Sequence, residues 1–149
     1  MAQIGWIDKV FSFFKKSPMG VYRNECWDSL SPSEKGAKGE KLALNYCKKE
    51  LGFRLITKNW RHRRGEIDLI CLDKDCLVFI EVRLRKAISL VSGVHSISRS
   101  KKSLLRRSAL AYLNRIQKHP KTYRFDIISI AYEQSKGYEI SHYRNVALF

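Results

Sequence analysis

The sequence predicts an α/β domain in which a mixed β-sheet is flanked by helices. Residues 65–85 hold two runs rich in β-branched and aromatic residues, separated by a short acidic break, which is typical of a β-hairpin. A helical pattern at 99–118 separates this hairpin from another apolar run at 125–132, and its length suits a crossover between parallel strands. A strand, a hairpin, a helix crossover and a further strand together make a mixed α/β layer.

The length and charge of the chain limit the classes of protein and of binding partner that it fits. The 149 residues suffice for one domain with a real core, and 44% hydrophobic with 29% charged residues is ordinary for a soluble protein. The 29 Lys and Arg against 14 Asp and Glu give a net charge of +15, which favours a polyanionic partner, either nucleic acid or an anionic membrane surface. No apolar run reaches the roughly 18 residues of a spanning helix, and the start lacks a cleavable leader pattern. We therefore expect a soluble, cytoplasmic protein.

Residues 1–30 are expected to form an extension of a main domain at 31–149. Apolar residues recur at helical spacing between positions 4 and 14, with charged residues elsewhere on the helical wheel. A short amphipathic helix of this kind could lie on an acidic membrane, dock on the domain, or pair with a second copy. Docking or a loosely held extension is favoured, membrane binding is not expected, and a homo-oligomer stays open.

The first helix of the domain is predicted at 31–50. Ser31 is a typical N-cap with an acid in the following turn, and Gly52 is a typical breaker beyond the end. Glu40 lies on the apolar side of this helix, so we expect it to point inward.

Two glycines, Gly36 and Gly39, weaken the first turns of this helix by roughly 1 kcal/mol each relative to alanine. This cost predicts that another segment approaches the helix closely there. A frayed helix start that leaves Glu40 in solvent is an equally weighted alternative.

A short strand is predicted at 53–57, and a basic tract follows it. Arg61, Arg63 and Arg64 in this tract could hold phosphates, and Trp60 could stack on a base, which fits a nucleic-acid groove. A solvated loop is the competing interpretation. For Trp60 we favour a position in the core.

The predicted hairpin carries two carboxylates within its apolar strands. If Leu72 faces Leu77 across the turn, the register places Asp68 directly opposite Glu81. Because like charges that face each other repel, this pair needs a partner. Oxygen ligands suit a hard ion such as Mg²⁺ or Mn²⁺. The alternative is that each acid pairs with a nearby arginine, and for an arbitrary Asp and Glu this is the commoner outcome.

The second half of the chain continues the pattern. Residues 86–98 lack regular spacing and are predicted to form a mobile loop beside the hairpin. The helix at 99–118 is apolar on one side, while Lys101 and Lys102 belong to a basic run in its first half. A solvated basic face is the default for such a run, and phosphate contact is the rival. A last strand is predicted at 137–143.

A series of short motifs runs from residue 36 to the C-terminus in unbroken order. They are Gly39-Glu40, Asn59-Trp60-Arg61, Gly65-Glu66-Ile67-Asp68-Leu69-Ile70, Phe79-Ile80-Glu81-Val82-Arg83-Leu84-Arg85, Lys101, Ala109 with Tyr112-Leu113, Arg124-Phe125-Asp126, and Ser141-His142-Tyr143-Arg144-Asn145-Val146. Together they resemble the YraN family of small bacterial proteins. The Gly-Glu-Ile-Asp-Leu-Ile string followed by the Glu-Val-basic strand is specific in combination, whereas residues 1–30 lie outside the resemblance.

Members of that family look like proteins of the restriction-endonuclease-type fold, which carries the PD-(D/E)XK signature of metal-dependent nucleases. The resemblance implies Glu40, Asp68 and Glu81 as metal-binding carboxylates, and the backbone carbonyl of Val82 as a further ligand. It implies Mg²⁺ or Mn²⁺ as cofactor and nucleic acid, with DNA preferred, as partner. Contacts to nucleic acid are then expected from Arg61, Arg63, Arg64, Arg85 and Lys102.

The chain departs from this signature at one position. Where the signature has its catalytic lysine, two residues after Glu81, this chain has Arg83. An arginine side chain keeps its proton, so it can hold a phosphate but cannot act as a base. Lys101 could supply the missing ammonium group, or it could be solvated.

Three functions remain open on the sequence alone. The first, slightly favoured, is a metal-dependent nuclease that hydrolyses phosphodiester bonds in DNA. A nucleic-acid-binding protein on the same fold, with cleavage weakened or lost, is the second. A membrane-surface or partner-binding protein that uses the N-terminal helix is the third. The catalytic set is Glu40, Asp68, Glu81, Arg83 and Lys101.

Overall fold

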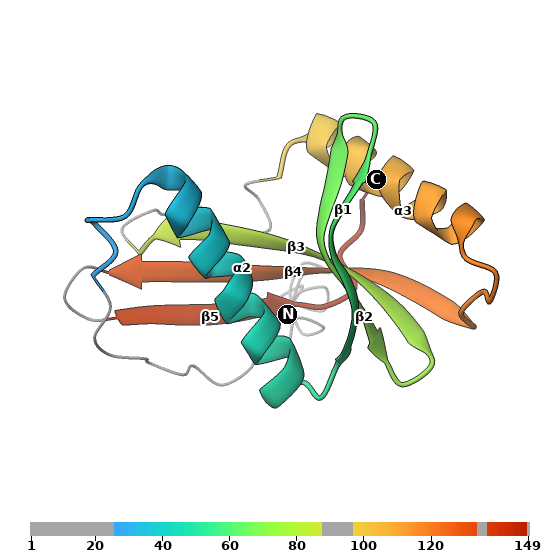
Figure 1. Cartoon of the computed structure of the whole chain (residues 1–149), viewed down its shortest axis with the longest axis horizontal. Helices are drawn as coiled ribbons and strands as arrows, with labels where there is room; N and C mark the ends of the chain where they lie inside the picture. The colour runs from blue at the N-terminus through green and yellow to red at the C-terminus, as the bar shows by residue number, and fades with distance from the viewer. Residues whose placement is uncertain (1–25, 88–96, 134–136, 149) are drawn as a thin grey trace, which may run out of the picture.

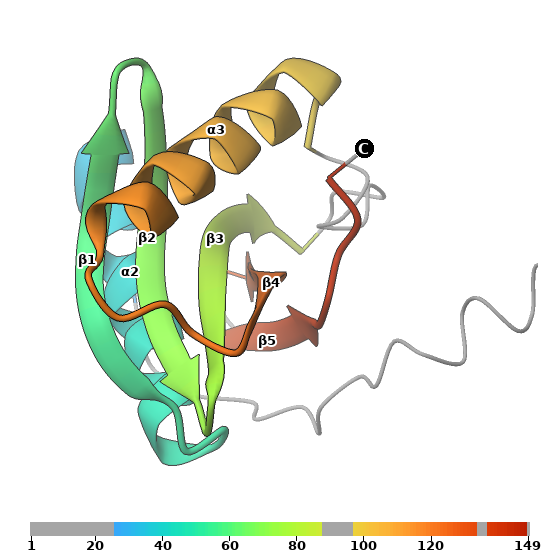
Figure 2. The same ribbon diagram turned by 90° about the vertical axis from the view of Figure 1, so that its right-hand side faces the viewer.

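The computed structural model describes residues 26–87, 97–133 and 137–148, and it confirms the predicted α/β fold class. A five-stranded mixed sheet is flanked by helices, consistent with a restriction-endonuclease-like fold. Helix α2 lies against one face of the sheet and α3 against the other (Figures 1 and 2). The elements in chain order are α2 (Pro32–Lys49), β1 (Arg54–His62), β2 (Gly65–Asp73), β3 (Cys76–Lys86), α3 (Arg99–Arg115), β4 (Thr122–Glu133) and β5 (Gly137–Tyr143).

Two predictions lie outside the described residues. They are the amphipathic helix between positions 4 and 14 and most of the loop predicted at 86–98, of which positions 88–96 are not described. The domain boundary after residue 30 stays a prediction. Trp27, which precedes that boundary, is fully buried and stacks on Tyr132 with a ring separation of 4.9 Å.

The sheet order is β1-β2-β3-β4-β5, and only β3 and β4 run parallel among these neighbours. Helix α3 is the crossover between those two strands, as predicted. The register of the β2–β3 hairpin is also confirmed, because Leu72 pairs with Leu77. Pairing continues to Asp73 and Cys76, so the turn itself is shorter than the acidic break suggested.

Helix α2 begins and ends where the sequence indicated. Ser31 and Glu34 form a reciprocal capping box, with the Ser31 N–H donating to the Glu34 carboxylate at 2.8 Å. Gly52 follows the helix with a φ of 67°, a conformation that favours glycine. The expected close approach was wrong for Gly36, where an added methyl would meet nothing within 4 Å. At Gly39 a methyl would make only an ordinary contact, 3.6 Å from Leu84.

Other element boundaries differ from the prediction. Strand β1 continues past the predicted end at 57 and through the basic tract to His62, because the tract pairs with β2, so the competing interpretation of that tract as a loop was wrong. Helix α3 ends at Arg115, three residues before the predicted end. Ile116 already has an extended backbone, with a ψ of 138°, and its side chain packs against the core. No helix within the described ranges is long and apolar enough to cross a membrane.

Two cores lie on opposite faces of the sheet. Strand β3 contributes to both, because its side chains alternate: Val78 and Ile80 pack on the α2 side, whereas Leu77 and Phe79 pack on the α3 side. This alternation assigns Glu81, the next residue in the odd series, to the side of the sheet that α3 covers.

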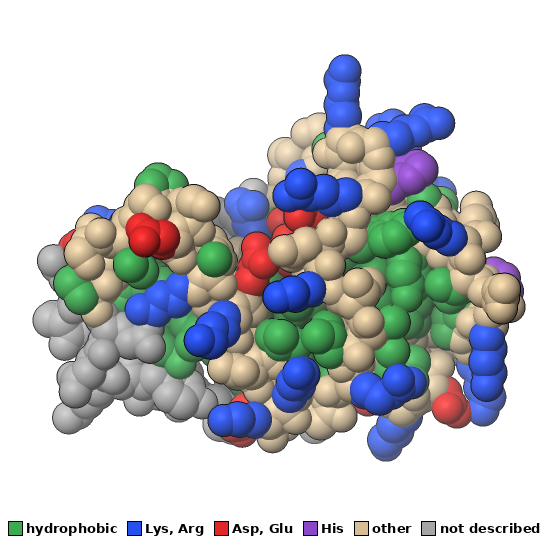
Figure 3. Space-filling model, viewed as in Figure 1, with side chains coloured by type: hydrophobic (Ala, Val, Ile, Leu, Met, Phe, Trp, Pro, Cys, Tyr) green, Lys and Arg blue, Asp and Glu red, His purple; other side chains and the backbone are tan. Residues whose placement is uncertain are grey.

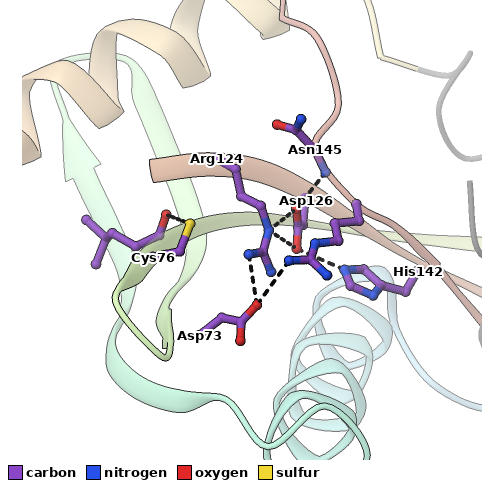
Figure 4. Close-up of polar contacts among 8 residues, drawn as sticks. Asp73, Cys76, Arg124, Asp126, His142 and Asn145 are labelled. Atoms are coloured by element: carbon purple, nitrogen blue, oxygen red, sulfur yellow. Dashed lines mark hydrogen bonds and ion pairs between the residues drawn. The ribbon is translucent and has the colours of Figure 1, made fainter. Parts of the chain in front are cut away.

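A network of ion pairs and hydrogen bonds lies where β4 and β5 meet the segment that follows β5 (Figure 4). We call it the Asp126 network, comprising Asp73, Arg124, Asp126, His142 and the Asn145 backbone. The Asp126 carboxylate, which is fully buried, accepts hydrogen bonds from Arg124 Nε at 3.0 Å and the Asn145 N–H at 2.9 Å, and it pairs with His142 Nε2 at 2.9 Å. Arg124 also pairs with Asp73 at 2.8 Å. The network thus fastens the segment after β5 to the sheet.

Candidate metal and phosphate site

Asp68 and Glu81 lie where β2 and β3 stop pairing. The last pair of this ladder is Leu69 with Ile80, and the next pair in the same register would be Asp68 with Glu81. In its place, Asp68 Oδ2 accepts a hydrogen bond from the Val82 N–H at 2.7 Å. The side chain of Asp68 therefore fills the position where a strand backbone would otherwise bond to β3.

The backbone of Val82 is consequently available on this side. A strand residue directs its N–H and its C=O to the same neighbouring strand. Because the Val82 N–H bonds to Asp68, its carbonyl faces the same gap between β2 and β3. A carbonyl oxygen here would be a third oxygen donor beside the two carboxylates.

Glu81 is buried and only partly satisfied. Its carboxylate is 5% exposed, and Oε1 lies 3.1 Å from Lys101 Nζ and 3.8 Å from the Arg83 guanidinium. The other oxygen, Oε2, has no hydrogen-bond partner within the described residues. Such a group is costly to bury unless something else binds it.

Lys101 reaches this site because of how α3 begins. Ser98 caps the helix, its hydroxyl accepting a hydrogen bond from the Lys101 N–H at 3.2 Å. The cap fixes the first turn of α3 above the odd-numbered face of β3, where Glu81 lies. The ammonium group of Lys101 therefore contacts the buried Glu81 carboxylate, while the Lys101 side chain stays 33% exposed to solvent.

The electrostatics of the two acids reflect this shortage of partners. Burial, and then the charge of Glu81, raise the pKa of Asp68 to about 7, against which the Val82 hydrogen bond acts only in part. Burial also raises the pKa of Glu81, although Lys101 and then Arg83 oppose the shift. Both carboxyl groups are thus held in surroundings that disfavour their charged forms.

Two further glutamates act on this pair. Glu40 of α2 is half-buried, and its charge contributes to the raised pKa of Asp68. Glu66 of β2, which was not among the predicted site residues, contributes to the raised pKa of Glu81. Figure 3 shows acidic side chains gathered near the centre of this view, surrounded by Lys and Arg. The alternation of β2 was the signal that could have included Glu66.

We tested whether these groups fit a divalent cation. Within the part of the chain that the structure describes, no three Asp, Glu, His or Cys side chains are close enough to hold an ion together. Mg²⁺ commonly takes only one or two protein carboxylates and keeps several waters. Asp68, Glu81 and the Val82 carbonyl meet that requirement, and the unpartnered Glu81 oxygen marks where added positive charge is needed. The role of Glu40 as a ligand stays a prediction.

The residues predicted to contact nucleic acid have different surroundings. Arg61 pairs with Glu66 at 3.1 Å. Arg85 donates to Ser129 Oγ at 3.4 Å, and Lys102 is half-buried on α3. The exposed side chains of Arg63 and Arg64 lie at the tip of the β1–β2 hairpin, where Figure 3 shows basic side chains projecting. Their contacts to nucleic acid stay a prediction.

Trp60 is half-buried and packs against the core on the α3 side, in line with the favoured position. Its Nε1 donates to the Ser108 carbonyl of α3 at 3.3 Å, and its ring meets Tyr112 edge-on at 5.2 Å. The guanidinium of Arg115 lies 5.5 Å from the ring centre. The indole therefore ties β1 to α3 and is not displayed for stacking on a base.

The family profile and the individual relatives that match this chain all belong to one protein family. The profile of a family described as "Uncharacterised protein family UPF0102" matches residues 39–130. A UPF0102 protein of Rhodococcus opacus is 36% identical over 110 residues, covering 74% of this chain and 92% of the relative. One of Chlorobaculum tepidum is 36% identical over 117 residues, covering 75% and 90%. One of Psychromonas ingrahamii is 45% identical over 98 residues, covering 66% and 79%.

Proposed function

Because this chain belongs to the UPF0102 family, the YraN family, whose description names no activity, we propose a function from the chain's own geometry. The proposal is a metal-dependent nuclease that hydrolyses phosphodiester bonds in DNA. One observation carries it: the half-buried Asp68 and the buried Glu81 lie on neighbouring strands, and one carboxylate oxygen of Glu81 has no partner in the described residues. A basic surface around an acidic centre suits a polyanionic substrate.

In the proposed centre, Asp68, Glu81 and the Val82 carbonyl would hold Mg²⁺ or Mn²⁺. When bound, such an ion supplies positive charge to the phosphate oxygens and lowers the pKa of a bound water. Lys101 and Arg83, both beside Glu81, orient the phosphate and balance its charge. Lys101 is the closer of the two and approaches from α3, so it is the better placed to substitute for a lysine on the strand.

The test is cleavage by the purified chain with Mg²⁺ or Mn²⁺ on single-stranded, duplex and branched DNA, with RNA of the same sequences alongside. Glu81→Gln and Asp68→Asn should each lower the cleavage rate at least about 100-fold, because each removes a charge that holds the cation. Asp75→Asn, which changes an exposed acid at the hairpin turn, is the control. Cleavage that survives both site substitutions would exclude this centre.

A second candidate is a nucleic-acid-binding protein on the same fold with weak or absent cleavage. Arg83 favours it, because an arginine cannot take up a proton from water. In that case, binding persists in EDTA and weakens steeply as salt rises. Binding would also survive Asp68→Asn. A binding protein of this kind differs from the nuclease only in the metal-dependent step, so the same protein preparations test both.

A further inference from the structure

A groove of about 740 Å³ lies between the tip of the β1–β2 hairpin and the outer side of α3. This volume is in the range of known ligand sites. Its hairpin wall carries His62, Arg63 and Arg64. The α3 residues that line it include Leu104 and Leu110, with Arg107 between them along the helix.

The two walls are fixed to each other. Gly65 sits so close to α3 that a methyl group there would overlap Ser108 Oγ and approach the Leu104 carbonyl to 3.0 Å. The Trp60 hydrogen bond to the Ser108 carbonyl holds the same contact from β1. Figure 2 shows α3 crossing the hairpin in this way. The groove is therefore a preformed feature of the fold.

Its rim is cationic. Arg63 and Arg64 are exposed, and neither makes an ion pair within the described residues. Arg107 is exposed, and its guanidinium donates to Ser103 Oγ at 3.1 Å. Three guanidinium groups around one groove favour the phosphates of a nucleic acid over a neutral ligand.

Its floor is apolar. Leu110 is 40% exposed, one of only three large hydrophobic side chains so exposed in the described part of the chain. Leu104 and Ala111 line the same floor. Along its length a duplex offers phosphates, sugars and base edges, but it keeps the faces of its bases stacked inside and away from such a surface. Unpaired bases can place their apolar faces against it while their phosphates meet the rim.

We propose that this groove binds an unpaired stretch of nucleic acid, so that the substrate has a single-stranded segment beside the point of cleavage. The binding stands without catalysis, and the link to cleavage rests on the proposed function. The groove and the acidic centre share α3: Lys101 serves the centre, and Leu104 begins the groove one turn later. Helix rise places Asn114, at the far end, about 20 Å beyond Lys101. An unpaired strand can extend further per nucleotide than a strand of B-form DNA, so about six nucleotides are enough to cover that length.

The first experiment measures binding in EDTA by fluorescence anisotropy. The probes are a blunt DNA duplex and the same duplex with a single-stranded tail of about six nucleotides. We expect the tailed probe to bind at least about tenfold more tightly. The double variant Arg64→Ala with Arg107→Ala should remove most of this preference. Arg54→Ala, which deletes an exposed arginine at the other end of β1, should retain it.

The second experiment separates the apolar floor from charge. Leu110→Ser should reduce binding of the tailed probe about three- to tenfold and leave the blunt duplex unchanged. Ile56→Ser, at a site 38% exposed and away from the groove, is the matched control and should change neither. Equal binding of tailed and blunt probes by the unaltered chain would overturn the proposal, as would equal losses for Leu110→Ser and Ile56→Ser.

The two proposals fail in different ways. A tail preference in EDTA without cleavage in Mg²⁺ or Mn²⁺ would reject the nuclease and keep the groove. Cleavage that depends on Glu81 but proceeds equally on blunt and tailed DNA, with no tail preference in binding, would keep the nuclease and reject the groove.

Discussion

Two sets of acids that are shielded from solvent to different degrees lie on adjacent strands, Glu81 and Asp126 buried and Asp68 half-buried, and they differ in how many donors reach them. Ile80, which precedes Glu81 on β3, pairs with Asp126 on β4, so the two sets are neighbours in the sheet. Asp126 is bound by two side chains and a backbone N–H. Asp68 receives one backbone hydrogen bond, and one oxygen of Glu81 has none within the described residues.

The pKa shifts run in opposite directions for this reason. Burial alone would raise the pKa of Asp126, but hydrogen bonds from His142, Arg124 and the Asn145 N–H lower it below its ordinary value. Burial raises the pKa of Asp68 to about 7, because no comparable set of donors offsets it. An acid with a full set of donors stabilises the fold, whereas an acid short of donors keeps capacity for a ligand.

The largest effect should come from breaking the satisfied set. Asp126→Asn removes the charge that compensates Arg124, which is buried, and leaves that guanidinium underpaired. We expect the free energy of unfolding to fall by about 3–5 kcal/mol, measured by urea denaturation. A loss below about 1 kcal/mol would show that the network contributes little to stability.

The unsatisfied set should respond in the opposite direction. Asp68→Asn removes a charge that is costly to bury, so in EDTA at pH 8 the variant should be more stable than the unaltered chain by about 1–3 kcal/mol. Because the folded pKa of Asp68 is raised above the unfolded value, its ionisation costs nothing below about pH 4. The cost grows as pH rises toward 7.

Urea midpoints at pH 5 and pH 8 check this sign. The stability gain of Asp68→Asn should be larger at pH 8 than at pH 5, since at pH 5 the folded unaltered chain still carries a protonated Asp68. A gain that is equal at both values, or a loss at pH 8, would place Asp68 among the satisfied acids.

Arg83→Lys should sharpen the functional side of the comparison. It places a lysine on the strand beside Glu81, where a proton can be exchanged, and we expect cleavage to rise about tenfold, equivalent to about 1.4 kcal/mol. Arg54→Lys, which changes an exposed arginine at the start of β1, is the matched control and should leave the rate unchanged. No increase for Arg83→Lys would indicate that Lys101 already fulfils this role.

The smallest effect is expected for an ion pair that is neither buried nor part of a network. Asp75 pairs with Lys121 at 2.8 Å, but the two side chains are 71% and 79% exposed. Asp75→Asn should therefore change the free energy of unfolding by less than about 1 kcal/mol. A loss approaching that of Asp126→Asn would mean that burial does not explain the difference between the sets.

The hairpin could be predicted from the sequence because its information is local. Alternation in β2 and β3 and the turn between Asp73 and Cys76 fix the register, so the approach of Asp68 to Glu81 followed from counting residues. The caps of α2 were equally local. The close approach predicted at Gly36 was wrong, since the low helix propensity of a glycine is readily outweighed by a good cap and by packing elsewhere along the helix.

The difference between the two sets of acids was not predictable in the same way. Glu81 and Asp126 each interrupt an apolar strand, and nothing nearby in the chain tells one from the other. The donors to Asp126 include His142 on β5 and Asn145 in the segment after it, sixteen and nineteen residues away. The groove escaped prediction for a similar reason, because its walls come from a hairpin tip and a helix joined only by the fold.

The gap between β2 and β3 has a consequence for genetics. In the proposed centre, one of the oxygens that would bind a cation is the main-chain carbonyl of Val82, and every side-chain replacement leaves that atom in place. A survey that exchanges each residue in turn would find Val82 tolerant of many substitutions and would overlook its contribution. Only backbone chemistry, such as an ester in place of the peptide bond that follows Val82, would weaken that oxygen as an acceptor and make its part visible.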